Sequence, residues 1–147
     1  MTTIPDYLAE LGVRFASGGD WGDSLRNLLA MEAELPSMSE TLKTEETRFH
    51  GCQSQIWLVI TLNGSTGKVE ISANSDSRIM RGLLAVAHGF YNNRTPDEIA
   101  ANPPALLRDT GLLDAMAPSR ANGFYRLLMH VHQYGASLCH STKGDVA

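Results

Sequence analysis

The chain has 147 residues, of which 43% are hydrophobic and 19% charged, so it is long enough to bury the core of one ordinary globular domain over 1–147. Its net charge of −4 and its lack of a basic run argue against nucleic acid as the main partner. The sequence shows no signal-peptide pattern and no apolar run long enough to span a bilayer. We therefore expect no membrane partner, and a cytoplasmic protein whose cysteines are free thiols.

The first third of the chain predicts one helix followed by an irregular stretch. Asp23 or Ser24 is suited to cap a helix that ends near Pro36. Residues 37–50 are polar and charged, which is typical of an irregular approach to Gly51.

The middle of the chain predicts a β-hairpin. Residues 55–62 are rich in Ile, Trp, Val and Leu with little alternation, which indicates a strand covered on both faces. The sequence Asn-Gly-Ser-Thr-Gly at 63–67 is typical of a hairpin loop, and residues 68–73 alternate like a returning antiparallel strand.

Two helix starts follow the hairpin. Asp76 is placed to accept hydrogen bonds from the free amides of a helix that runs from about 78 to 91. The sequence Thr-Pro-Asp-Glu at 95–98 predicts a second, short helix, because it is a capping box with proline at the first helical position.

The last third of the chain predicts more helix. A short helix is expected up to Gly111, and a longer one begins near Pro118. We expect the longer helix to end at about Gly135 and the tail from Cys139 to Ala147 to be frayed. Helices on both sides of one hairpin indicate an α+β domain.

Cys52 is the residue on which a chemical function depends. Free cysteine is most often buried as a small apolar residue. However, Gly51 can adopt backbone angles that expose the next side chain, and residues 53–55 are too polar for a core. Arg48 and His50 are close enough in sequence to favour the thiolate. The residues therefore permit a nucleophile without deciding between the two roles.

A metal site is the third reading of Cys52. His50, Cys139 and His140 complete a possible set of four ligands with it. The set lacks the paired Cys-x-x-Cys spacing that makes a zinc prediction specific.

Arg120 is the other residue with a possible role outside its own element. It falls in the first turn of the predicted last helix, where a cation opposes the helix dipole. This placement favours a contact with a partner, and a solvated arginine is the alternative.

Four ordered motifs resemble the SufE/CsdE family of sulfur-acceptor proteins. The similarity extends over about residues 24–134, as one SufE-like domain with the N-terminal segment and the C-terminal tail peripheral. The motifs are the cysteine motif Gly-Cys-Gln-Ser-Gln-Ile-Trp at 51–57, Ser-Asp-Ser-Arg-Ile at 75–79 with Arg-Gly-Leu at 81–83, Tyr-Asn-Asn-Arg-Thr-Pro at 91–96, and Pro-Ser-Arg-Ala-Asn-Gly at 118–123.

The resemblance implies an α+β fold with helices packed around a small antiparallel sheet of about three strands, similar to the iron–sulfur scaffold IscU. It also implies that Cys52 accepts persulfide sulfur from a cysteine desulfurase of the SufS or CsdA kind and stimulates that enzyme. The sulfur would pass to iron–sulfur cluster assembly, for example to a SufB-type scaffold. The desulfurase carries pyridoxal phosphate and this chain binds no cofactor, so it is expected to act as an accessory persulfide carrier rather than as a free-standing enzyme.

The same resemblance assigns supporting residues. Arg48, Gly51, Gln53, Asp76 and Arg120 are expected to contact the partner or to hold the loop. We also expect the apolar residues 56–58 to shelter the persulfide. Two alternatives remain open, namely an iron–sulfur or zinc scaffold and a regulator that binds the desulfurase without using Cys52.

Overall fold

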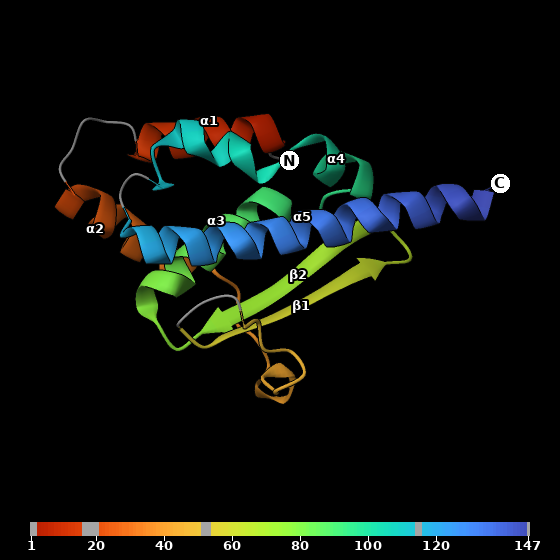
Figure 1. Cartoon of the computed structure of the whole chain (residues 1–147), viewed down its shortest axis with the longest axis horizontal. Helices are drawn as coiled ribbons and strands as arrows, with labels where there is room; N and C mark the ends of the chain where they lie inside the picture. Colours follow the sequence, from red (N-terminus) through yellow and green to blue (C-terminus); the bar gives the residue numbers. More distant parts are fainter. Residues whose placement is uncertain (1–2, 16–20, 51–53, 114–115, 147) are drawn as a thin grey trace.

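The computed structural model describes residues 3–15, 21–50, 54–113 and 116–146, with the backbone alone at 21–24 and 139–146. It confirms the α+β class, because the α-helices lie on one side of a small antiparallel sheet (Figure 1). The elements in chain order are α1 (Ile4–Phe15), α2 (Trp21–Met31), the 3-10 helices η1 (Glu32–Glu34) and η2 (Glu40–Leu42), β1 (Ile56–Asn63), β2 (Lys68–Ser75), α3 (Arg78–Tyr91), α4 (Pro96–Ala101), the 3-10 helix η3 (Pro104–Thr110) and α5 (Pro118–Val146).

The predicted hairpin is present, with Ile56 opposite Ser75 at one end and Asn63 opposite Lys68 at the other. Asn63 shapes the turn, because its side-chain Oδ1 accepts the backbone N–H groups of Ser65 at 2.9 Å and Thr66 at 3.2 Å. Gly67 closes the loop with a φ of 71°, which glycine adopts without strain.

Short extended segments continue the sheet at both edges. On the β1 side, Leu58 donates its N–H to the carbonyl of Thr47 at 2.8 Å, and Arg48 forms a bridge with Trp57. On the β2 side, Val69 exchanges backbone hydrogen bonds of 2.7 Å with the segment 93–94. Within the described residues the sheet therefore has two strands, with a paired segment beyond each of them.

The core lies between the hairpin and the helices. Alternate residues of β2 are buried, whereas α3 is buried along almost all its length. Helices α2 and α3 approach closely at Gly82, where an added Cβ would overlap the backbone carbonyl oxygen of Leu28. In Figure 1, α3 and α5 lie between α1 and the hairpin. The largest fully buried side chains include Tyr91, Phe90, Phe124, Ile4, Leu11 and Met31.

The helix starts correct one prediction and confirm another. Ser77, not Asp76, caps α3, because the Ser77 hydroxyl accepts the N–H of Met80 at 3.3 Å. The carboxylate of Asp76 is instead bonded to a distant part of the chain. The capping box of α4 is present as predicted, with Thr95 and Glu98 each accepting the other's backbone N–H at 3.1 Å.

Two predicted helix limits are wrong. Helix α2 begins at Trp21, so Asp23 and Ser24 lie inside it and do not cap it. Helix α5 passes Gly135 and continues to Val146, beyond the rest of the fold (Figure 1). An added Cβ at Gly135 would lie 2.7 Å from Cγ2 of Ile99, so this glycine allows α4 and α5 to pack closely rather than ending the helix.

A separate observation concerns membranes. None of the helices in the described ranges is both long and apolar enough to cross a bilayer.

Candidate functional site

The candidate site is defined by the residues on either side of Cys52. Cys52 itself lies outside the described residues, as do Gly51 and Gln53. We call residues 50–54 the Cys52 segment. Phe49 precedes it, and its N–H donates to the carbonyl of Ile56 at 2.8 Å. The chain therefore enters and leaves the Cys52 segment at neighbouring points beside β1.

The end of β2 holds Gln55, which directly follows the Cys52 segment. The Ser75 hydroxyl donates to the Gln55 carbonyl at 2.6 Å, and the N–H of Asp76 donates to the same oxygen at 3.4 Å. The Gln55 N–H donates in turn to Oδ1 of Asp76 at 3.2 Å. Both backbone groups of Gln55 are thus bonded, and the structure brings Asp76 to this flank of the Cys52 segment.

Arg48 lies on the other flank. Its backbone pairs with Trp57, and its guanidinium Nη1 lies 3.3 Å from Oε1 of Glu45. The Nε atom is buried and has no hydrogen-bond partner among the described residues. Arg48 therefore places a partly buried cation beside the start of the Cys52 segment.

Among the predicted site residues that the structure describes, Arg120 is the one that is not joined to these flanks. It is half-buried in the first turn of α5, and its side chain makes no hydrogen bond or ion pair with a described residue. Helix α5 reaches the site through another residue, since the rings of Phe49 and His130 are 5.8 Å apart.

Residues 56–58, which were expected to shelter the persulfide, lie at the start of β1. Ile56 is fully buried in the core. Because successive side chains of a strand point to opposite faces, Trp57 lies on the outer face, where Nζ of Lys43 lies 5.7 Å from its ring centroid. The three side chains therefore do not share one face of β1.

Ser75 and Arg81 are site residues that the sequence analysis did not assign. Arg81 donates from Nη1 to the Ser75 carbonyl at 2.9 Å, and its Nη2 lies 3.4 Å from Oε2 of Glu32. The serine-aspartate pair that precedes the predicted helix was the available signal. Of this pair only Asp76 was expected to contact the partner or to hold the loop, because nothing local indicates that Ser75 lies beside Gln55.

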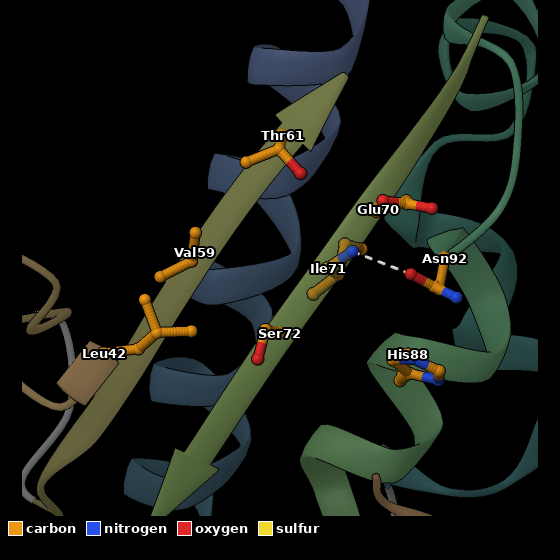
Figure 2. A pocket seen from close by; sticks show the side chains of 8 residues that line it. All are labelled: Leu42, Val59, Thr61, Glu70, Ile71, Ser72, His88 and Asn92. Carbon is orange, nitrogen blue, oxygen red and sulfur yellow. Dashed lines mark hydrogen bonds between the residues drawn. The ribbon is translucent and has the colours of Figure 1, made fainter. Parts of the chain in front are cut away.

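A hollow opens on the outer face of the hairpin, with a volume of about 490 Å³. It lies between β1, β2 and the end of α3, where Asn92 accepts the N–H of Ile71 at 2.7 Å (Figure 2). Burial lowers the pKa of His88 in this hollow. The lining residues are Leu42, Val59, Thr61, Glu70, Ile71, Ser72, His88 and Asn92.

Within the described ranges, no group of three or more His, Cys, Asp or Glu side chains is placed to hold a metal ion. Cys52 and the side chain of Cys139 lie outside those ranges.

Comparison with known proteins assigns the family. Residues 9–135 match the model of SufE, described as an Fe-S metabolism associated domain, and the chain belongs to the SufE family. It is 35% identical over 125 residues to an uncharacterised SufE-like protein of Synechocystis, covering 85% of this chain and 77% of that one. It is 33% identical over 114 residues to the sulfur acceptor protein CsdE of Escherichia coli, covering 77% of each. The resemblance inferred from the sequence motifs is therefore confirmed.

A solved structure supports the fold. The solution structure of a hypothetical protein from Thermus thermophilus matches with a TM-score of 0.67, covering 93% of this chain and 99% of that chain. The two sequences are 19% identical, so this likeness shows the fold alone.

Proposed function

We propose that this chain is a sulfur acceptor and carrier that takes persulfide sulfur from a cysteine desulfurase on Cys52. In this role it stimulates the desulfurase and relays the sulfur to iron–sulfur cluster assembly. Membership of the SufE family supports the proposal, as does the similarity to CsdE, which is named a sulfur acceptor. The structural observation that carries it is the anchoring of both flanks of the Cys52 segment, at Phe49 and at Gln55.

The transfer is a thiol exchange that needs no external oxidant. The Cys52 thiolate attacks the outer sulfur of the donor's persulfide and forms a new S–S bond. The donor's own S–S bond breaks, and its electron pair leaves with the donor cysteine as a thiolate. The outer sulfur and its proton thus move to Cys52 as Cys–S–SH, while the donor regains its free cysteine.

The flanking residues suit this exchange. The reaction requires the thiolate form, and a nearby cation favours that form. Arg48 supplies a cation at the start of the Cys52 segment, while Asp76 holds the end of it. Arg120 is half-buried in the first turn of α5 and supplies a cation for contact with the partner.

The proposal also names the partners and the place of action. The donor is a cysteine desulfurase of the SufS or CsdA kind, which carries the pyridoxal phosphate, and this chain binds no cofactor. The next acceptor is a scaffold of the SufB type. Both exchanges take place in the cytoplasm, where thiols are kept reduced.

The deciding experiment compares Cys52→Ser with Cys139→Ser. Each variant is incubated with a purified cysteine desulfurase and L-cysteine, sulfide release is measured, and the carrier is analysed by mass spectrometry. We expect the wild type and Cys139→Ser to stimulate the desulfurase and to gain one sulfur atom on Cys52. Cys52→Ser is expected to do neither. Full stimulation by Cys52→Ser would instead indicate a regulator that acts by binding alone.

The scaffold alternative has its own test. Anaerobic reconstitution with iron and sulfide should leave the protein colourless if it is a carrier. A visible cluster absorption band that depends on Cys52 would contradict the proposal.

A further inference from the structure

We infer that Ser75 and Arg81 are positioning residues for sulfur transfer, because with Glu32 they fix the direction in which the chain leaves the Cys52 segment. The inference rests on the proposed function of Cys52 and extends it to residues outside the cysteine motif. It comes from a continuous set of contacts that joins η1, α3 and the end of β2 to Gln55.

The Ser75 hydroxyl makes two hydrogen bonds, one as acceptor and one as donor. It accepts the N–H of Ser77 at 3.2 Å and lies 2.6 Å from the Gln55 carbonyl. A backbone carbonyl only accepts, so the hydroxyl proton must point at Gln55. Ser75 is 3% exposed, and water therefore has little access to replace this bond. The carbonyl of Gln55 is thus fixed in one orientation.

Arg81 holds the backbone of Ser75 in place. Its planar guanidinium donates two hydrogen bonds. Nη1 donates to the Ser75 carbonyl at 2.9 Å, and Nη2 donates to Oε2 of Glu32 at 3.4 Å. A lysine at this position could not make both contacts in the same way, because its ammonium group is a single point charge. Arg81 lies in the first turn of α3, where a cation is unfavourable for the helix dipole. Helix stability therefore does not explain an arginine here, whereas its two contacts do.

Glu32 is the last residue in this series of contacts, and the packing of α2 against α3 holds it in place. It lies in η1, directly after α2, and α2 is held close to α3 at Gly82. Its side chain is 25% exposed and that of Arg81 is 28% exposed. Ion pairs of this exposure contribute little to the free energy of unfolding. The loss of this ion pair should consequently change the position of Gln55 and have only a small effect on the free energy of unfolding.

Arg78 offers a matched control. Its Nε lies 3.3 Å from the same Oε2 of Glu32, but its side chain is 69% exposed and, within the described residues, makes no hydrogen bond with Ser75. Arg78→Gln and Arg81→Gln thus remove the same charge from the same carboxylate and the same helix turn. Only Arg81→Gln releases the Ser75 carbonyl.

The first test measures Cys52 without any partner. In a Cys139→Ser background Cys52 is the only thiol, and its rate of alkylation by iodoacetamide is measured for the full chain. We expect Ser75→Ala and Arg81→Gln to raise the rate about fivefold, the ratio that corresponds to one lost hydrogen bond of ~1 kcal/mol. Arg78→Gln should react like the unchanged protein, and Glu32→Gln should lie between the two. Equal rates in all four variants would overturn the inference.

The second test uses sulfur transfer from a purified cysteine desulfurase, with each carrier titrated to saturation. We expect Ser75→Ala and Arg81→Gln to lower the maximal stimulation about fivefold and to leave the half-saturating concentration unchanged within about twofold. A change in the half-saturating concentration alone would place these residues in docking and overturn the inference. If Ser75→Ala does not fold, Arg81→Gln carries both tests, because its side chain is partly exposed.

The two proposals fail in different ways. Full activity of Cys52→Ser refutes the proposed function, and the alkylation rates still decide whether Ser75 and Arg81 position the Cys52 segment. Loss of activity in Cys52→Ser, with Ser75→Ala and Arg81→Gln fully active, refutes the positioning role alone.

Discussion

Asp76 and Gln55 form a reciprocal pair across 21 residues of sequence. The Asp76 carboxylate accepts the N–H of Gln55 at 3.2 Å, and the N–H of Asp76 lies 3.4 Å from the Gln55 carbonyl. This pair joins the end of the hairpin to the residue that follows the Cys52 segment. Asp76 does not cap α3, because the cap is the next residue, Ser77, whose hydroxyl accepts the N–H of Met80.

The first prediction concerns the carboxylate of Asp76. Asp76→Ala should raise the alkylation rate of Cys52 several-fold and lower the free energy of unfolding by about 1 kcal/mol, because it leaves the Gln55 N–H without its partner. Asp76→Asn keeps an oxygen in the same place and should have a smaller effect on both quantities. Iodoacetamide kinetics and urea unfolding measure them. If alanine and asparagine leave the alkylation rate equally unchanged, Asp76 does not hold the segment.

The second prediction concerns the cap of α3. Ser77→Ala should lower the free energy of unfolding by about 1 kcal/mol, because the N–H of Met80 loses its acceptor. Ser77→Asp retains an acceptor and should remain close to the wild type in urea unfolding. A cost for Asp76→Asn larger than that for Ser77→Ala would favour Asp76 as the cap and contradict the structure.

The parts of the fold that were predicted correctly depend on local signals. The hairpin loop at 63–67 follows from Asn-Gly, and the capping box at Thr95 and Glu98 follows from two residues of one turn. The first residues of α3 and α5 were also predicted from residues close to them in sequence. Each of these signals lies within a few residues of the structure it specifies.

The errors come from contacts between distant segments. Gly135 was expected to end the last helix, but it lies inside α5 because Ile99 of α4 packs against it. Asp76 was expected to cap α3, but Ser77 is the cap and Oδ1 of Asp76 accepts the N–H of Gln55. Ser75 and Arg81 were missed for the same reason, since their partners belong to other elements. The motifs identified the Cys52 segment and Asp76, whereas the contacts of Ser75 and Arg81 are seen only in three dimensions.

The third prediction is a pH dependence of stability from His88. Burial lowers the pKa of His88 below the ordinary value of 6.5, so the folded protein holds its proton less tightly than the unfolded chain. Below pH 6.5 the unfolded state therefore binds more protons, and stability falls as the pH falls. His88→Gln removes this contribution. Urea unfolding between pH 5 and 8 should show a shallower decline for the variant. Parallel curves for the two proteins would contradict the assignment.

The fourth prediction tests the close approach of α2 and α3. Gly82→Ala should lower the free energy of unfolding by about 2 kcal/mol, because the new Cβ overlaps the Leu28 carbonyl oxygen and forces two backbones apart. Gly64→Ala is the matched control, since nothing lies within 4 Å of the added atom there, and it should change stability by less than about 0.5 kcal/mol.

The same substitution also tests the anchor of the Cys52 segment. Glu32 follows α2 and Arg81 adjoins Gly82, so separating the two helices should lengthen the 3.4 Å contact between their side chains. Under conditions where Gly82→Ala remains folded, Cys52 should therefore be alkylated faster, by an amount similar to that caused by Glu32→Gln. An alkylation rate equal to that of Gly64→Ala would show that the Cys52 segment does not depend on the spacing of α2 and α3. In that case Ser75 and Asp76 would hold Gln55 without help from Glu32.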